Sequence, residues 1–330
     1  MSTNRYSVVG MGNAIVDVIS HVEDEFITRH ALDRGAMRLI EATEATALYG
    51  AMPPGIEASG GSAANTIAGI ASFGGDVAYI GKVRDDQLGE VFMHDIRAAG
   101  VDYTVTPGAE GDPTARCLIV VTPDAQRTMN TFLGISRNLS PHDVDEQVVA
   151  SADLLYCEGY LWDVDVAKEA ITKGMDLAHR AGGKTALALS DGFCVDRHRA
   201  EFLDLVEHHV DVLFANEIEI CSLYEVATFD EAMQHVRGHC EIACLTRSAK
   251  GSVIVTADEV HVIDAHPVDR IVDTTGAGDL YAAGFLHGLS SGHDLATCGR
   301  LASLAASEAI SHLGARPLSV LADLAKPLLR

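Results

Sequence analysis

The sequence predicts an α/β protein: a three-layer α/β/α sandwich with a mainly parallel central sheet, plus a small β-sheet lid. Short apolar runs of strand length recur along the chain, and helix-length amphipathic segments lie between several of them. Two further regions interrupt this alternation with period-2 and turn-like patterns. Parallel strands need helices on both faces, so the alternation favours this fold class.

The predicted elements of the central sheet follow one another along most of the chain. Its helices include the segment 164–182 and the segment that begins after Gly276. Its strands are short apolar runs at 6–12, 77–83, 154–160, 184–190, 210–216 and 242–246.

The two interrupting regions, 14–58 and 102–135, predict the lid. Their period-2 pattern favours a small antiparallel sheet that lies over the central one. The Pro/Gly-rich stretch 52–61 is predicted to be the hinge through which the chain returns to the main body. No linker is long enough to separate independently folding domains, so 1–330 is predicted to be a single domain that carries this lid.

Composition excludes several functional classes. The 330 residues include 24 Lys+Arg and 47 Asp+Glu, a formal net charge of −23, which argues against nucleic-acid binding and against docking on anionic membranes. The 7 cysteines form no CxxC pair, as expected for buried thiols in a reducing compartment. With no leader pattern and no apolar run of about 18 residues, we expect a cytoplasmic protein with a small-molecule partner.

The segment 273–289 carries the strongest chemical signal. Gly276, Ala277 and Gly278 form a small-residue turn that opens a helix, and the free N–H groups of such a turn bind phosphate. Asp279 stands in the first helical turn, where a carboxylate can accept the proton of an attacking hydroxyl. The helix dipole is expected to keep Asp279 ionised. The alternative is structural: Asp279 satisfies the helix start and the glycines permit tight packing.

A second glycine-rich segment spans 60–92. Gly60 and Gly61 let backbone approach a ligand closely, and Asn65 offers a donor and an acceptor to a polyhydroxylated substrate. An ordinary helix–turn–strand unit is the alternative. Two other glycine patterns fail as motifs. Gly10-x-Gly12 is followed by Ile15 rather than a third glycine, and Gly183-Lys184-Thr185 precedes a strand, so neither a dinucleotide fold nor a P-loop is supported.

Together, residues 60–92 and 273–286 resemble the two signatures of the ribokinase/PfkB carbohydrate kinase family, in the right order and about 200 residues apart. The resemblance implies a ribokinase-like fold and an ATP-dependent phosphotransferase with Asp279 as the base. Asn216 and Glu219 match an Asn-x-x-Glu element that organises Mg²⁺, Glu219 acting through water. The resemblance also implies nucleotide contacts and a monovalent cation such as K⁺ at Asp273; the nucleotide contacts are Thr246, Ser248 (in place of the usual Gly), Gly251, Thr275 and Gly278.

Within the family the chain is similar to the adenosine kinase subgroup. The segment 126–140 resembles that subgroup's lid, with Arg127 facing the phosphate, and Lys82 is a further candidate cation. The resemblance implies that the ribose is held by Asn13, Asp17, Gly61, Ser62 and Asn65, and the base by Cys117, Leu133 and Tyr160 or Leu161.

The expected reaction is phosphorylation of the 5′-hydroxyl of adenosine, giving AMP. Two alternatives stay open. One is a sugar kinase of the same fold that acts on ribose, fructose or 2-keto-3-deoxygluconate; the other is a non-catalytic nucleoside-binding protein. Such proteins occur as monomers and as homodimers, and the sequence does not distinguish these states.

Overall fold

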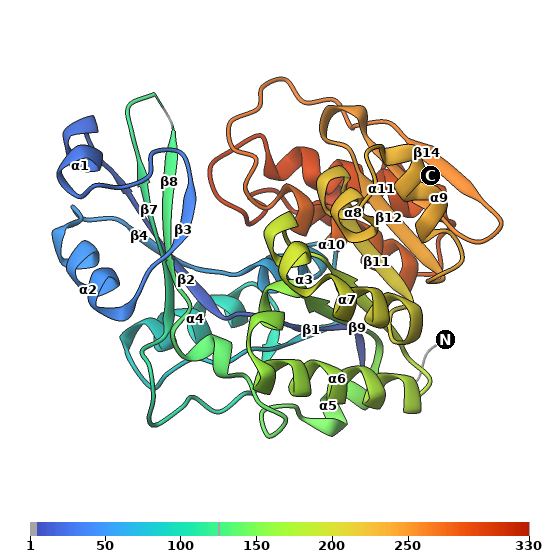
Figure 1. Cartoon of the computed structure of the whole chain (residues 1–330), viewed down its shortest axis with the longest axis horizontal. Helices are drawn as coiled ribbons and strands as arrows, with labels where there is room; N and C mark the ends of the chain where they lie inside the picture. Colours follow the sequence, from blue (N-terminus) through green and yellow to red (C-terminus); the bar gives the residue numbers. More distant parts are fainter. Residues whose placement is uncertain (1–4, 125, 330) are drawn as a thin grey trace.

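The computed structural model describes residues 5–124 and 126–329. Residues 1–4 of the N-terminal stretch, Ala125 of the predicted lid segment and Arg330 lie outside the described residues. Nine strands form the central sheet (Figure 1): β1 (Tyr6–Met11), β5 (Val77–Ile80), β6 (Asp102–Tyr103), β9 (Ala152–Glu158), β10 (Lys184–Ala188), β11 (Val212–Asn216), β12 (Ile242–Thr246), β13 (Ser252–Val255) and β14 (Val260–Ile263).

The strand order is β14-β13-β12-β11-β10-β9-β1-β5-β6. Every pair from β12 to β6 is parallel, and only the pairs β12–β13 and β13–β14 are antiparallel. The mainly parallel α/β fold is therefore confirmed. Each of the six predicted strands overlaps a strand of this sheet.

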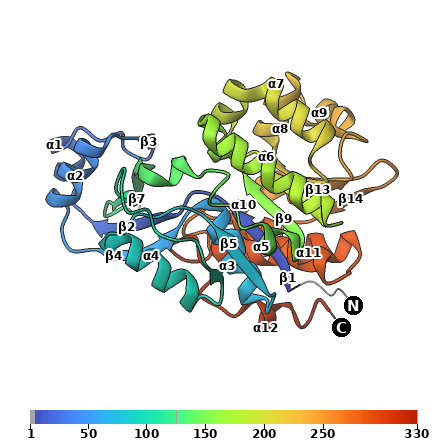
Figure 2. The ribbon, with the colours of Figure 1, turned by 90° about the horizontal axis from the view of Figure 1, so that it is seen from below.

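Helices cover both faces of the central sheet because successive strand residues point to opposite sides. Val8 of β1 belongs to one core and Val9 to the other. On the side of Val8 lie α3 (Ser62–Ser72), α4 (Gln87–Ala98), α10 (Ala277–Ser290), α11 (Leu295–Ala309) and α12 (Leu321–Ala325). On the side of Val9 lie α5 (Glu146–Ala150), α6 (Asp165–Arg180), α7 (Gly192–His208), α8 (Glu217–Tyr224) and α9 (Phe229–Val236) (Figure 2).

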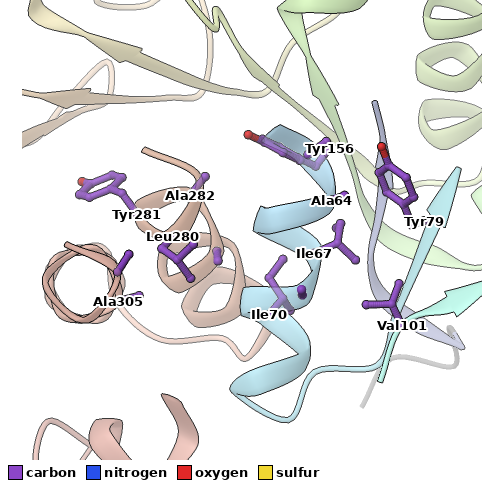
Figure 3. Packing of buried hydrophobic residues seen from close by; sticks show 14 of the residues in the cluster. Ala64, Ile67, Ile70, Tyr79, Val101, Tyr156, Leu280, Tyr281, Ala282 and Ala305 are labelled. Atoms are coloured by element: carbon purple, nitrogen blue, oxygen red, sulfur yellow. The ribbon is translucent and has the colours of Figure 1, made fainter. Parts of the chain in front are cut away.

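Close packing of α3 against α10 brings two helix N-termini together. A Cβ on Gly69 of α3 would lie only 2.7 Å from the Cβ of Ala283 in α10, so the small residues let the helices approach. Figure 3 shows Ile67 and Ile70 of α3 beside Leu280 of α10. One glycine-rich segment leads into α3 and the other into α10. The packing of these two helices therefore places the two segments side by side.

A second sheet stands beside the main body (Figure 1, left). Its strand order is β3-β8-β7-β2-β4. The strands are β2 (Ile15–His21), β3 (Met37–Leu39), β4 (Ile56–Gly60), β7 (Ala115–Val121) and β8 (Arg127–Phe132), with α1 (Asp24–Arg29) and α2 (Ala42–Ala51) between them.

This sheet is mixed, so the expectation of an antiparallel sheet was wrong. The hairpin β7–β8 and the pair β2–β4 are antiparallel, but β2–β7 and β3–β8 are parallel. The parallel partners are separated by long stretches of chain, and no tight turn forces them to run in opposite directions. The stretch 52–61 is also more than a hinge, because β4 occupies half of it and pairs with β2.

Three short 3₁₀ helices complete the chain: η1 (Gly134–Asn138), η2 (Gly159–Asp163) and η3 (Ser248–Lys250). All seven cysteines are free thiols, and most of them are buried. Among the described residues, no helix is both long enough and apolar enough to cross a membrane.

Candidate active site

A cavity of about 630 Å³ lies between the second sheet and the carboxyl ends of four central strands. Asn13, Glu158, Ser190 and Asn216 line it from just after or at the ends of β1, β9, β10 and β11. Ligands of open parallel sheets bind outside the carboxyl ends of the strands, so this is where a substrate is expected. The loop before α10 forms one end of the cavity, and the second sheet forms the other.

The turn that opens α10 needs its glycines for two different reasons. Gly276 adopts φ +79°, and a Cβ there would lie 2.6 Å from the Cβ of Ala315, so only glycine fits. A Cβ on Gly278 would meet nothing within 4 Å, which leaves this side of the turn open to the cavity. The first-turn N–H groups have no partner within the helix and are available to an anion.

Asp279 lies at the junction of α10 and α3. Its Oδ1 accepts a hydrogen bond from Ser62 Oγ (2.7 Å), and its Oδ2 accepts one from Asn65 Nδ2 (3.0 Å). Burial raises the pKa of Asp279, opposed by these two hydrogen bonds and by the charge of Arg316. The expectation that the helix start alone would keep Asp279 ionised was incomplete, because burial acts against ionisation and side chains of α3 supply the compensating donors.

Asn13 lines the cavity but uses its side chain inside the protein. Its backbone N and Nδ2 both donate to Glu158 Oε1 (2.8 Å each), and its Oδ1 accepts from Ser136 Oγ (2.8 Å). Glu158 Oε2 accepts from the N–H of Ala63 at the start of α3 (2.7 Å). Glu158 is 1% exposed, and burial raises its pKa to about 7. The pair therefore ties β1, β9, η1 and α3 together beneath the cavity.

Two predicted ribose contacts lie where β2 meets β4. Gly61 has φ +98°, and a Cβ there would lie 2.1 Å from the carbonyl oxygen of Asn13, so the close approach requires glycine. Asp17 of β2 lines the cavity beside Gly60. Burial raises the pKa of Asp17 to about 6, although the charges of Arg127 and Arg316 oppose the shift.

The end of the cavity next to the second sheet is mainly apolar, although Arg38 of β3 and Asp17 of β2 also line it. Cys117, Leu133 and Tyr160, the residues predicted to contact the base, all line the cavity, whereas Leu161 is buried in the core beneath α6 and α7. Phe193, 79% exposed at the start of α7, lines it from the main body. Further apolar lining comes from Ile15, Met37, Leu39, Ile119 and Met129.

Asn216 and Glu219 line the cavity and form the N-terminal cap of α8. Asn216 Oδ1 accepts from the N–H groups of Ile218 and Glu219 (2.9 Å each). The carboxylate of Glu219 accepts in return from Asn216 N (2.9 Å) and Nδ2 (2.6 Å). This capping box explains the spacing of three residues in structural terms. Burial raises the pKa of Glu219 to about 7.

The remaining predicted nucleotide contacts separate into two groups. Thr275 lines the main cavity, and Thr246 lines a smaller one of about 190 Å³ that also reaches Asp279. Ser248 and Gly251 lie in the turn around η3, outside the lining of both cavities. Ser248 adopts φ +51°, a left-handed conformation that favours glycine, so the serine strains a turn for which glycine is better suited.

Arg127 and Asp273 are brought together, although the resemblance implied separate roles for them. The Arg127 guanidinium of β8 forms an ion pair with Asp273 Oδ2 in the loop before α10. Asp273 Oδ2 also accepts from Gly314 N (3.0 Å), and its Oδ1 accepts from Thr275 N (3.0 Å) and Oγ1 (2.7 Å). Arg127 was expected to face the phosphate, but it is not among the described residues that line the cavity, and its Nε is buried without a hydrogen-bond partner among them.

Comparison with known proteins decides the family. Residues 53–321 match the model of the pfkB family carbohydrate kinases. The chain belongs to this family. The kinase is an ATP-dependent phosphotransferase, and it is 26% identical to the adenosine kinase of Saccharomyces cerevisiae over 331 residues (93% of this chain, 95% of the relative).

Two solved structures resemble the kinase over nearly its whole length. The adenosine kinase from Sinorhizobium meliloti is 49% identical with a TM-score of 0.91, and it covers 98% of this chain and 99% of its own. A probable sugar kinase protein from Rhizobium etli CFN 42 is 48% identical with a TM-score of 0.92 and the same coverage. These likenesses confirm the ribokinase-like fold, and they leave the acceptor of this kinase open.

The residues of the kinase fit one of the two expected cations. The carboxylate of Glu219 suits Mg²⁺, which prefers carboxylate, water and phosphate ligands, because each of its oxygens accepts only one hydrogen bond. Asn216 Oδ1 already accepts two hydrogen bonds, so Asn216 serves to hold that carboxylate in place. Asp273 does not suit K⁺, because four donors already fill its carboxylate and one of them is a guanidinium. Lys82 also differs from expectation: its Nζ pairs with Asp143 (2.8 Å), away from the residues that line the cavity.

Sequence reasoning missed Glu158 and Phe193. Glu158 ends an apolar strand, and a carboxylate at the carboxyl end of a buried strand is a usable signal. Phe193 lies in the first turn of α7, shortly after β10, and an aromatic residue just beyond a strand's carboxyl end is a weaker signal. Both would have required knowledge of which strands lie next to each other.

Proposed function

We propose that this kinase transfers the γ-phosphoryl group of ATP to the 5′-hydroxyl of a nucleoside, with adenosine as its preferred acceptor. One observation carries the proposal: the cavity is graded along its length. Asp279 and the anion-binding turn line it from α10, Asn65 lines it from α3, and Asp17 with a mainly apolar set of side chains lines it from the second sheet. A nucleoside has the same order of groups, from hydroxymethyl through ribose to base, whereas a free sugar leaves the mainly apolar end unfilled.

In this mechanism Asp279 accepts the proton as the 5′-oxygen attacks the γ-phosphorus. The O–H bond breaks, the new O–P bond forms, and the bond from phosphorus to the bridging oxygen of ADP breaks. Ser62 and Asn65 hold both carboxylate oxygens in place, so Asp279 keeps its orientation towards the hydroxyl. The N–H groups of the turn Gly276–Gly278 stabilise the charge on the transferring group.

Asn216 and Glu219 would orient Mg²⁺ through water, and the ion, when bound, neutralises charge on the phosphates. Arg127 contributes through its ion pair with Asp273, which fixes the loop that leads into the turn, because Arg127 itself is not among the described residues that line the cavity. In this proposal the second sheet is a lid that excludes water, because its strands β2, β7 and β8 form the far wall of the cavity.

The test is ADP release with Mg-ATP across adenosine, inosine, guanosine, ribose, fructose and 2-keto-3-deoxygluconate. Preferential turnover of adenosine, with AMP as product, is the expected result. The second candidate is a sugar kinase, favoured by the likeness to the Rhizobium etli probable sugar kinase. Turnover of a free sugar alone would establish that candidate instead. Nucleoside binding without turnover would indicate a non-catalytic binding protein.

Asp17→Asn is expected to raise the KM for adenosine about 10–100-fold, since a hydrogen bond to a charged group contributes about 1.5–3 kcal/mol. The value of kcat is expected to change less, because Asp17 does not touch the reacting hydroxyl in this proposal. In the wild type the KM should also rise as the pH falls below about 6, where Asp17 becomes protonated. Initial rates at several pH values measure both effects.

The matched control is Asp230→Asn, which changes an exposed carboxylate of α9. It should leave the KM within about twofold of the wild type. An Asp17→Asn enzyme with unchanged KM would remove Asp17 from the ribose site.

A further inference from the structure

A partly buried arginine lies behind the candidate base and is separated from it by the side chain of Asn65. Arg316 belongs to the segment between α11 and α12. Its Nε donates to Asn65 Oδ1 (2.8 Å), and its Nη2 donates to Ser59 Oγ (2.9 Å). Asn65 and Ala315 line the main cavity, but Arg316 is not among the described residues that line it. The arginine can therefore act on the site only through its neighbours.

The arginine decides which way the amide of Asn65 points. A guanidinium has donors only, so the atom facing Arg316 must be the amide oxygen. The amide nitrogen is then directed at Asp279 Oδ2, 3.0 Å away. An ionised carboxylate only accepts hydrogen bonds, so this orientation supports the ionised, proton-accepting form of Asp279. With the amide reversed, Asn65 would present an oxygen to the carboxylate, and the two would repel each other.

The far side of Arg316 is fixed as well. Ser59 donates from both its N and its Oγ to Asp95 Oδ2 of α4 (2.7 Å each) while its Oγ accepts from Arg316. The hydrogen bonds of Arg316 thus go to neutral side chains rather than directly to a carboxylate. Its charge remains unneutralised by direct contact and lowers the pKa of Asp279 and of Asp17, against the effect of burial.

We propose that Arg316 is a positioning residue for phosphoryl transfer: it locks the Asn65 amide so that Asn65 and Ser62 hold Asp279 ready to take the proton of the acceptor hydroxyl. The proposal rests on the role of Asp279 in the proposed function. It extends the site by a chain of side chains, Asp95–Ser59–Arg316–Asn65–Asp279, contributed by α4, β4, the C-terminal segment, α3 and α10.

Arg316→Gln tests the proposal through the division of its effect between kcat and KM. We expect kcat to fall about 10–100-fold, the scale of a misplaced catalytic group, while the KM for ATP stays within about threefold. Arg316→Lys keeps the charge and one donor, and it should recover part of the loss. In an Asn65→Ala background the same Arg316→Gln change should lower kcat by less than about threefold, because the contact it acts through is gone.

The acceptor in these assays is whichever compound of the panel above the wild type turns over. A wild type that prefers a sugar would overturn the adenosine proposal. The Arg316 variants could still be compared with the wild type, with that sugar as the acceptor. The control is Arg97→Gln, which removes an exposed arginine that donates to Tyr103 O away from the site. Full activity in Arg316→Gln, or an equal loss of kcat with and without Asn65, would overturn the role of Arg316. Should Arg316→Gln fail to fold, Arg316→Lys replaces it in both backgrounds: a smaller fall in kcat that disappears without Asn65 is then expected, and an equal fall in both backgrounds, or none, would overturn the role of Arg316.

Discussion

Asp279→Asn is expected to lower kcat about 10²–10⁴-fold, with a change of less than about threefold in the KM for the acceptor. Asparagine keeps the size of the side chain but cannot accept the proton of the attacking hydroxyl. Its amide would also face a donor, Ser62 Oγ or Asn65 Nδ2, on at least one side, since both carboxylate oxygens accept hydrogen bonds in the structure. Steady-state kinetics with Mg-ATP and the preferred acceptor measure the effect.

Asp294→Asn provides the matched control, because Asp294 is also a carboxylate at a helix start. It caps α11 by accepting from Thr297 N (2.8 Å), and asparagine caps a helix about as well. Its kcat should equal that of the wild type. An Asp279→Asn enzyme that retained most of its kcat would exclude Asp279 as the general base.

Arg127→Met is expected to lower the free energy of unfolding by about 3 kcal/mol, because it leaves a buried carboxylate without its cation. The side chains of Arg127 and Asp273 are only 9% and 5% exposed. The value lies at the lower end for buried pairs, since Thr275 and Gly314 still donate to Asp273. Urea unfolding at pH 7 measures the loss.

The double variant Arg127→Met/Asp273→Asn should be less destabilised than the sum of the two single variants, since neither charge is then left alone. Arg5→Met serves as the control: it breaks an exposed ion pair with Asp102, for which about 1 kcal/mol or less is expected. Additive losses in the double variant would show that Arg127 and Asp273 do not stabilise each other. The turnover of Arg127→Met should fall as well, because Asp273, in the loop that leads into the anion-binding turn, loses its ion pair with β8.

Local chemistry explains which parts of the kinase could be predicted from the sequence. Alternating apolar runs and helical segments depend on near neighbours, and they predicted the central sheet and its covering helices. The glycines of 276–278, and Asp279 in the first turn after them, form a local motif as well. Such a motif can be read without knowing what packs against it.

Only the tertiary structure decided how distant residues combine. Asn65 and Arg316 are 251 positions apart, Arg127 and Asp273 are 146 apart, and Asn13 and Glu158 are 145 apart. The pairing of β2 with β7 was equally hidden, because no turn joins them. Burial in the folded protein raises the pKa of Asp279. The carboxylate of Asp273 accepts hydrogen bonds from Thr275 and Gly314 and pairs with Arg127, and only the fold brings the last two of these residues to it. The sequence by itself determined the family, the fold class and the candidate base. The hydrogen bonds that hold Asp279 depend on the packing of α3 against α10. Small residues such as Gly69 allow this packing, but their presence in the sequence does not predict which helix will be the partner.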